Sequence, residues 1–155
     1  MEEYKTRKEL QVSAIENGTV IDHIPAKSVF QVVNILGLAD CKEQILFGTN
    51  LESKKYDRKG IIKVANLFFK SDEINKIALV APSATLIVIR DYKVVEKRNV
   101  EVPDQVHRFV RCFNPNCITN HEKLPTKFNV IDKVDLKLEC IYCEKTTAKD
   151  NLDFI

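Results

Sequence analysis

The sequence predicts an α+β protein of two domains: an antiparallel-rich, five-stranded N-terminal sheet with two helices on one face, and a small all-β, zinc-ribbon-like C-terminal domain. Two observations support this prediction. Strand-like and helical patterns alternate in the first two thirds of the 155 residues, whereas the last third shows only short strand patterns and holds four of the five cysteines. Pro103 follows the last long strand pattern, so we expect domains over residues 1–101 and 102–155.

The first domain opens with extended chain and then a helix. Residues 10–15 alternate between apolar and polar, which is typical of a strand with one buried face. A second extended stretch runs up to Pro25. The residue before a proline is disfavoured in a helix, so no helix should run into this position. Residues 26–38 should form an amphipathic helix packed on the sheet, with Gly37 near its end. Its apolar positions recur at helical spacing: Val29, Phe30, Val32, Val33 and Leu36.

Further strands and a second helix complete the first domain. Strand patterns lie over residues 44–49, 60–65, 84–89 and 94–100. Residues 86–89 are apolar on both faces, which indicates a strand inside the sheet. Ser71 followed by Asp72 and Glu73 predicts a helix N-terminus, because a hydroxyl caps free amides and acids favour the first turn. In the second domain, strand patterns lie over residues 109–111, 128–131 and 135–139.

Two close pairs of cysteines predict a metal site in the second domain: Cys112 with Cys117, and Cys140 with Cys143. Zinc accepts four thiolates in a tetrahedron, and short spacers let backbone amides turn towards the sulfurs. Four thiolates leave no position for a reactive water, so we expect one structural zinc ion per chain. A domain of about fifty residues rarely stabilises itself by core burial alone, and the metal would supply the missing stability.

Two disulfides or four inert thiols are the alternatives to zinc. Disulfides need an oxidising compartment, whereas residues 1–9 are charged and show no apolar signal core. We therefore expect a reducing, cytoplasmic location, which favours metal. His107 and His121 flank the first cysteine pair, so either could replace one thiolate. Cys41 has no cysteine nearby and is expected to be a half-buried thiol.

The composition gives little reason to expect a nucleic-acid or membrane partner. The net charge is +2, and residues 102–155 hold eight Lys/Arg against eight Asp/Glu. A nucleic-acid-binding zinc-ribbon module, the main rival function, should instead present a basic face. No apolar run reaches the length of a membrane span. A nucleotide-using enzyme is the second rival, but the three histidines are scattered and no catalytic signature is recognisable.

A run of cations precedes the third strand pattern. The run surrounds the single acid Asp57 and consists of Lys54, Lys55, Arg58, Lys59 and Lys63. A solvated loop and a polyphosphate site both explain such a run. The four glycines form no phosphate-cradling loop, so a phosphate site would have to use side-chain cations.

The most specific stretch of the chain is Gly-Thr-Val-Ile-Asp-His-Ile-Pro over residues 18–25, which follows the strand pattern of residues 10–15. Together with positions within residues 58–63, 81–85 and 92–97 and with the two cysteine pairs, this stretch resembles, in register, the regulatory chain of aspartate carbamoyltransferase. The resemblance covers almost the whole chain, and the long motif occurs together with the cysteine spacing.

The resemblance implies a non-catalytic subunit. Regulatory chains of this family bind CTP as an inhibitor and ATP as an activator, in competition for one site in the N-terminal domain. They pair through those domains into homodimers, and their zinc domains dock on the catalytic chains. The assembled enzyme joins carbamoyl phosphate to aspartate in pyrimidine biosynthesis.

The resemblance also implies an effector site. Lys97, Lys63 and His23 should neutralise phosphates, with Lys59 nearby, and Asp22 should accept hydrogen bonds from ribose hydroxyls. Backbone groups at residues 12–15 and 92–94 should read the base, whereas Lys54 and Lys55 stay solvated. The full set is Val12, Ser13, Ala14, Ile15, Asp22, His23, Lys59, Lys63, Tyr92, Val94 and Lys97. Ile87 stands where well-known members have an asparagine, which removes one polar contact.

Overall fold

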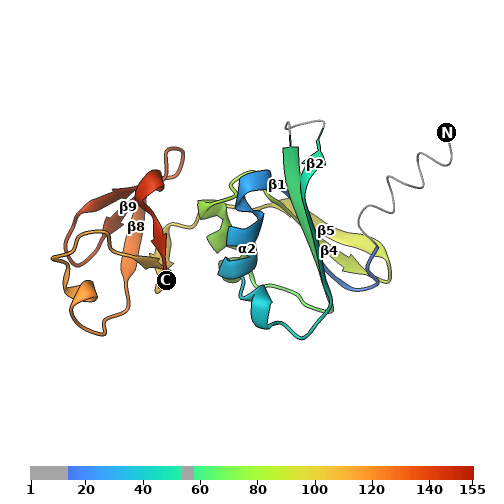
Figure 1. Ribbon diagram of the computed structural model, residues 1–155, viewed down its shortest axis with the longest axis horizontal. Helices are drawn as coiled ribbons and strands as arrows, with labels where there is room; N and C mark the ends of the chain where they lie inside the picture. The colour runs from blue at the N-terminus through green and yellow to red at the C-terminus, as the bar shows by residue number, and fades with distance from the viewer. Residues whose placement is uncertain (1–13, 54–57) are drawn as a thin grey trace. The chain divides into compact units, whose positions relative to one another are not determined.

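The computed structural model describes residues 14–53 and 58–155 (Figure 1). The chain divides into two compact units, Met1–Glu101 and Val102–Ile155. Most of the strand predicted over residues 10–15 lies outside the described residues. Ala14 and Ile15 are described and are not in a strand, so this part of the prediction is wrong, although Ile15 is buried.

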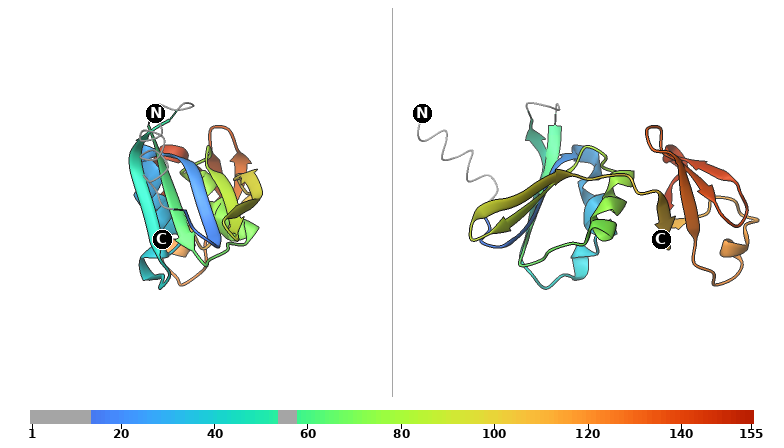
Figure 2. Two further views of the ribbon diagram at one scale, coloured as in Figure 1. Left: turned by 90° about the vertical axis from the view of Figure 1, so that its right-hand side faces the viewer. Right: turned by 180° about the vertical axis from the view of Figure 1, so that it is seen from behind.

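The first unit is a five-stranded sheet in the order β2-β3-β1-β4-β5, with every neighbouring pair antiparallel. Its strands are β1 (Gly18–Pro25), β2 (Ile45–Glu52), β3 (Arg58–Ala65), β4 (Thr85–Arg90) and β5 (Lys93–Asn99). The helices α2 (Val29–Ile35) and α3 (Ser71–Asn75) lie on one side of the sheet (Figures 1 and 2). The predicted α+β class is confirmed, and β4 lies inside the sheet as expected.

Strand β3 shows why the sheet has one covered face. Gly60, Ile62 and Val64 are buried, whereas Lys59 and Lys63 are half-buried. Successive side chains of a strand point to opposite faces, so the apolar positions turn towards the helices and the lysines turn away from them. The sequence alternation alone therefore places two cations on the face opposite the helices.

The helices differ in detail from the sequence prediction. Helix α2 is shorter than residues 26–38, and Gly37 follows it with a left-handed φ of 65°. Phe30 was expected in the core but is 65% exposed. Ser71 is the first residue of α3 and not its cap, since the N-cap position is Lys70 and makes no side-chain capping bond. The acids predicted in the first turn, Asp72 and Glu73, are confirmed there.

Gly60 is required by the close packing of α2 against β3. A Cβ atom at this position would overlap Cγ2 of Val29, a β-branched side chain held at the start of α2. We expect Gly60→Ala to lower the free energy of unfolding by about 1–3 kcal/mol, because a packed interface has no room for an added methyl group. Urea unfolding followed by circular dichroism measures this loss.

Gly48→Ala is the matched control for Gly60→Ala. Gly48 lies in the neighbouring strand β2, where an added Cβ would first meet Cδ1 of Leu51 at 3.2 Å. That atom is the end of a flexible side chain, so a small shift relieves the contact. Equal losses of stability in the two variants would contradict the packing explanation.

The second unit is all-β, as predicted, and contains a four-stranded sheet in the order β10-β9-β8-β6 and a two-stranded sheet of β11 and β7. Its strands are β6 (Gln105–His107), β7 (Val110–Arg111), β8 (Lys127–Asp132), β9 (Lys137–Cys140), β10 (Thr146–Ala148) and β11 (Asp153–Phe154). The sequence patterns missed β6, β10 and β11. Phe128 of β8 and Leu138 of β9 are fully buried. Among the described residues, no helix is long and apolar enough to cross a membrane.

Candidate functional site

The four cysteines of the second unit converge on one point. Their Sγ atoms all lie within 4.8 Å of one another, with Cys112 and Cys143 separated by 3.6 Å and Cys117 and Cys140 by 3.8 Å. A tetrahedron with zinc–sulfur bonds of about 2.3 Å has sulfur–sulfur edges of about 3.8 Å. The four thiols therefore fit one zinc ion. The disulfide alternative does not hold, because all four cysteines are free.

Backbone amides point at the sulfurs, as the short spacers predicted. The amide of Asn114 hydrogen-bonds to Cys112, and the amides of Tyr142 and Cys143 hydrogen-bond to Cys140. The Thr119 hydroxyl lies 3.1 Å from Sγ of Cys117. These dipoles disperse the negative charge of a thiolate cluster, so they support metal binding.

Burial decides how the thiols ionise. Desolvation raises the pKa of Cys112 and of Cys140, since both side chains are buried. Burial also opposes ionisation of Cys143. Hydrogen bonds from the Asn114 side chain, the Lys145 amide and the neighbouring thiols outweigh that effect and lower its pKa to about 7. Zinc binds thiolates, so uptake of the metal releases the protons of the buried thiols of Cys112 and Cys140.

Both histidines near the first cysteine pair are engaged elsewhere. The His121 Nε2 atom lies 2.8 Å from the carbonyl O of Pro115, and His107 Nε2 lies 3.3 Å from Oε1 of Gln105. Within the described residues, the one cluster of potential metal ligands contains only the four cysteines. Cys41 is half-buried and apart from that cluster, as predicted.

The sheet face opposite the helices carries the lysines predicted to bind the effector. Val20 pairs with Lys63 on β3 and with Ile87 on β4, and Ile87 pairs with Lys97 on β5. Directly paired residues of antiparallel strands point to the same face. Lys63 and Lys97 therefore flank two apolar residues in one row, although more than thirty residues separate them in the sequence. Ile87 lies at the middle of that row, where the resemblance implied an asparagine.

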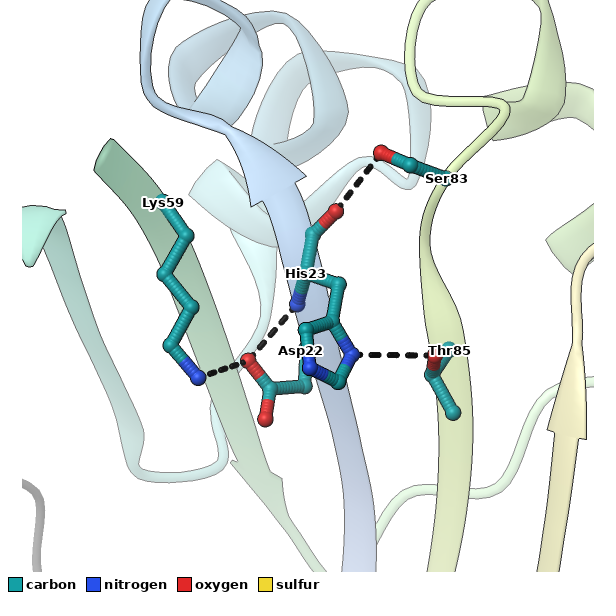
Figure 3. Close-up of polar contacts among 5 residues, drawn as sticks. All are labelled: Asp22, His23, Lys59, Ser83 and Thr85. Carbon is teal, nitrogen blue, oxygen red and sulfur yellow. Dashed lines mark hydrogen bonds and ion pairs between the residues drawn. The ribbon is translucent and has the colours of Figure 1, made fainter. Parts of the chain in front are cut away.

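A bulge in β1 brings Asp22 and His23 to the same face. Ile21 pairs with Ile62 and Ile24 pairs with Gly60, so two residues of β1 lie opposite one residue of β3. Ile21 and Ile24 are both fully buried on the helix side. In a regular strand one of the two residues between them would also have pointed inwards. The bulge instead leaves both half-buried and turned away from the core (Figure 3).

Asp22 is the centre of a small polar network (Figure 3). Its Oδ1 atom lies 2.8 Å from Nζ of Lys59 and accepts a hydrogen bond of 2.6 Å from the His23 amide. The His23 ring approaches the hydroxyl of Thr85 through Nδ1 at 3.1 Å. We call the surface formed by His23, Lys59, Lys63 and Lys97, together with the one acid Asp22, the cationic face.

Lys63 is a partly desolvated cation of this group. Burial lowers its pKa, and the negative charge of Asp22 raises it again by a smaller amount. A lysine in this setting gains from an anionic ligand, because the ligand restores part of the electrostatic stabilisation lost from water. The cationic face is therefore suited to a bound phosphate.

The turn before β5, predicted to read the base, is joined to the chain directly after Ile15. The amide of Tyr92 donates to the carbonyl O of Glu16 at 2.9 Å. That N–H is already used, so it does not read a base in this conformation. Tyr92 and Val94 are exposed, with 68% and 61% of their surfaces accessible, and Ala14 is exposed as well.

Some predicted residues lie outside the described part of the chain: Val12, Ser13, Lys54, Lys55 and Asp57. Conversely, sequence reasoning assigned no role to Thr85 or to Ser83, whose hydroxyl donates to the carbonyl O of His23 at 2.8 Å (Figure 3). Thr85 is one of the residues matched within 81–85, which was the available signal, whereas Ser83 is the unmatched position of that stretch.

Comparison with known proteins covers both units. The allosteric domain of the aspartate carbamoyltransferase regulatory chain matches residues 10–101, and the metal-binding domain of that chain matches residues 104–153. The chain belongs to the aspartate carbamoyltransferase regulatory chain family. Members of this family are non-catalytic subunits of an enzyme of pyrimidine biosynthesis, so the predicted family, its allosteric role and the structural zinc site are confirmed.

Individual family members are similar over nearly their whole length. The regulatory chain of Bacteroides thetaiotaomicron is 50% identical over 151 residues, which cover 97% of this chain and 99% of that one. The regulatory chain of Pyrococcus abyssi is 53% identical over 146 residues, which cover 93% and 96%. The regulatory chain of Phocaeicola vulgatus is 50% identical over 149 residues, which cover 96% of each.

Proposed function

We propose that this chain binds CTP as an inhibitor and ATP as an activator on the cationic face, and passes the signal to catalytic chains through its zinc domain. Residues 1–101 would form the effector domain, and residues 102–155 would dock the catalytic chain. The assembly would work in the cytoplasm, where reducing conditions keep the four thiols free for zinc.

The observation that carries the proposal is the register of the sheet. It gathers Lys63 and Lys97 into one row, beside Lys59 and His23, on a face that the helices leave uncovered. A nucleoside triphosphate carries several negative charges, and charge-assisted bonds to ammonium groups are among the strongest polar contacts available. Asp22 is placed to accept hydrogen bonds from ribose hydroxyls once Lys59 turns towards phosphate.

We also propose that two copies of the chain pair along the β2 edge of the sheet. Phe30 and Phe47 are 65% and 48% exposed, and their rings stack edge to face with centroids 5.6 Å apart. Among the described residues, strand β2 lies at the edge of the sheet, and an edge strand offers backbone groups that a second copy can pair with. An aromatic pair next to such an edge is typical of an interface that excludes water.

Signal transmission requires the effector to distinguish two quaternary states. A nucleotide shifts their populations only to the extent that it binds one state better than the other. By linkage, an active-site analogue bound to the catalytic chain must then change the affinity of the regulatory chain for CTP.

The proposal is tested by assembling the zinc-loaded chain with a catalytic chain and measuring CTP binding by calorimetry. We expect ATP to compete with CTP for one site, and an active-site analogue on the catalytic chain to change the CTP dissociation constant by about five-fold or more. Equal CTP affinities with and without the analogue would show that the effector site and the active site are not coupled. Simultaneous binding of CTP and ATP would contradict the single site.

A further inference from the structure

His23 holds an unusual backbone conformation at the centre of the cationic face. Its φ is 57°, in the left-handed region that a residue with a side chain seldom adopts. The residue lies in the bulge of β1, where the strand has no regular partner on β3. A local conformation of this kind persists only where the surroundings hold it.

Ser83 supplies one such restraint from a distant part of the chain. It is half-buried in the turn Ala81–Ala84 before β4, and its Oγ donates a hydrogen bond of 2.8 Å to the carbonyl O of His23. On the other side, the His23 amide donates to Oδ1 of Asp22 at 2.6 Å. The backbone of His23 is therefore held at both its N–H and its C=O (Figure 3).

We propose that Ser83 is a positioning residue of the nucleotide site: its hydroxyl fixes the bulge so that Asp22 and His23 face the ligand together. This inference rests on the proposed function. Without the Ser83 bond, the His23 carbonyl loses one restraint, and the spacing of the Asp22 carboxylate and the His23 ring is less firmly fixed. Preorganisation of this kind strengthens binding because the ligand need not order the site.

The bond requires a short side chain that donates a proton. An alanine at this position would leave the His23 carbonyl without the bond, whereas a threonine would keep the hydroxyl. A purely structural role for Ser83 predicts a different result, namely a loss of stability with no specific loss of nucleotide affinity. The two roles are separated by comparing Ser83 with another hydroxyl of the same unit that bonds a backbone carbonyl.

Thr19 provides that comparison. Its hydroxyl donates to the carbonyl O of Leu67 at 2.7 Å, on the helix-covered side of β1. Thr19→Val removes a bond of the same type between the same kinds of atom and leaves the cationic face untouched. We expect Ser83→Ala to weaken CTP binding about three- to ten-fold, Ser83→Thr to restore it, and Thr19→Val to leave it unchanged.

The experiment uses the full zinc-loaded chain, with CTP titrated calorimetrically and the backbone of His23 followed by NMR. The carbon chemical shifts and the amide–Hα coupling of His23 report its positive φ without any nucleotide. We expect this signature to be altered in Ser83→Ala and kept in Thr19→Val. Unaltered His23 signals, or equal losses of CTP affinity in Ser83→Ala and Thr19→Val, would overturn the inference.

The outcome also separates this inference from the proposed function. A wild-type chain that binds no CTP overturns the proposed function, and the role of Ser83 in nucleotide binding with it. A wild-type chain that binds CTP, next to a Ser83→Ala variant that binds it equally well, overturns the role of Ser83 alone.

Discussion

Removal of zinc is expected to unfold residues 102–155 and to release the catalytic chain, while CTP binding to the first unit stays measurable. The second unit is small, and its buried thiols lie among its few core side chains. Structural zinc in such domains contributes on the order of 10 kcal/mol of folding free energy, more than a domain of this size gains from its core. Zinc content, circular dichroism and co-purification with the catalytic chain measure the three effects.

Cys140→Ser should reproduce the effect of metal removal without a chelator. Cys140 is fully buried at the end of β9, and a serine hydroxyl is a poor zinc ligand. Cys41→Ser is the matched control, because Cys41 is a half-buried thiol outside the cluster and should lose neither zinc nor partner. A metal-free second unit that stays folded and keeps its partner would refute the structural role of zinc.

Lys63→Gln is expected to weaken CTP binding by about ten-fold or more, since a hydrogen bond to a charged group contributes roughly 1.5–3 kcal/mol. The Lys63 side chain is partly desolvated and lies on the cationic face. Water therefore cannot fully replace the interaction between its charge and the bound triphosphate. Calorimetric titration of the full chain measures the change. Lys42→Gln removes an equal charge from an exposed loop before β2 and should leave CTP affinity nearly unchanged.

The lowered pKa of Lys63 gives this prediction a pH dependence with a definite sign. Only the protonated amine attracts the triphosphate, and burial makes Lys63 lose its proton below the ordinary lysine value of about 10.4. CTP affinity should therefore fall as the pH rises through the alkaline range. Lys63→Arg keeps its charge there and should show a smaller decline than the wild type. Equal declines in wild type and Lys63→Arg would assign the effect to another group.

The metal site could be predicted from the sequence because its information is local. Each pair of cysteines lies in one short turn, so the spacing alone orients two sulfurs and the amides beside them. The apolar and polar alternation of β3 likewise placed Lys59 and Lys63 on one face, since the period of a strand is fixed by its geometry. The resemblance then implied which of these cations would bind an effector, which stays a prediction.

Other features depended on contacts between distant segments. The helical period of residues 26–38 placed Phe30 with the core residues, but Phe30 stacks on Phe47 of β2, the edge strand of the described sheet, and stays exposed there. Strands β6, β10 and β11 are two or three residues long and carry no period of their own. They exist because a neighbouring strand offers hydrogen bonds.

By itself, the sequence determined the two-domain α+β class, the four zinc ligands and the cations available to an effector, because residue type, spacing and period act locally. Only the tertiary structure decided that Lys63 and Lys97 share a row, that Asp22 and His23 point the same way, and that Ser83 reaches the His23 carbonyl. Each of these depends on the register between strands far apart in the chain. A shift of one residue in that register turns a side chain to the opposite face of the sheet.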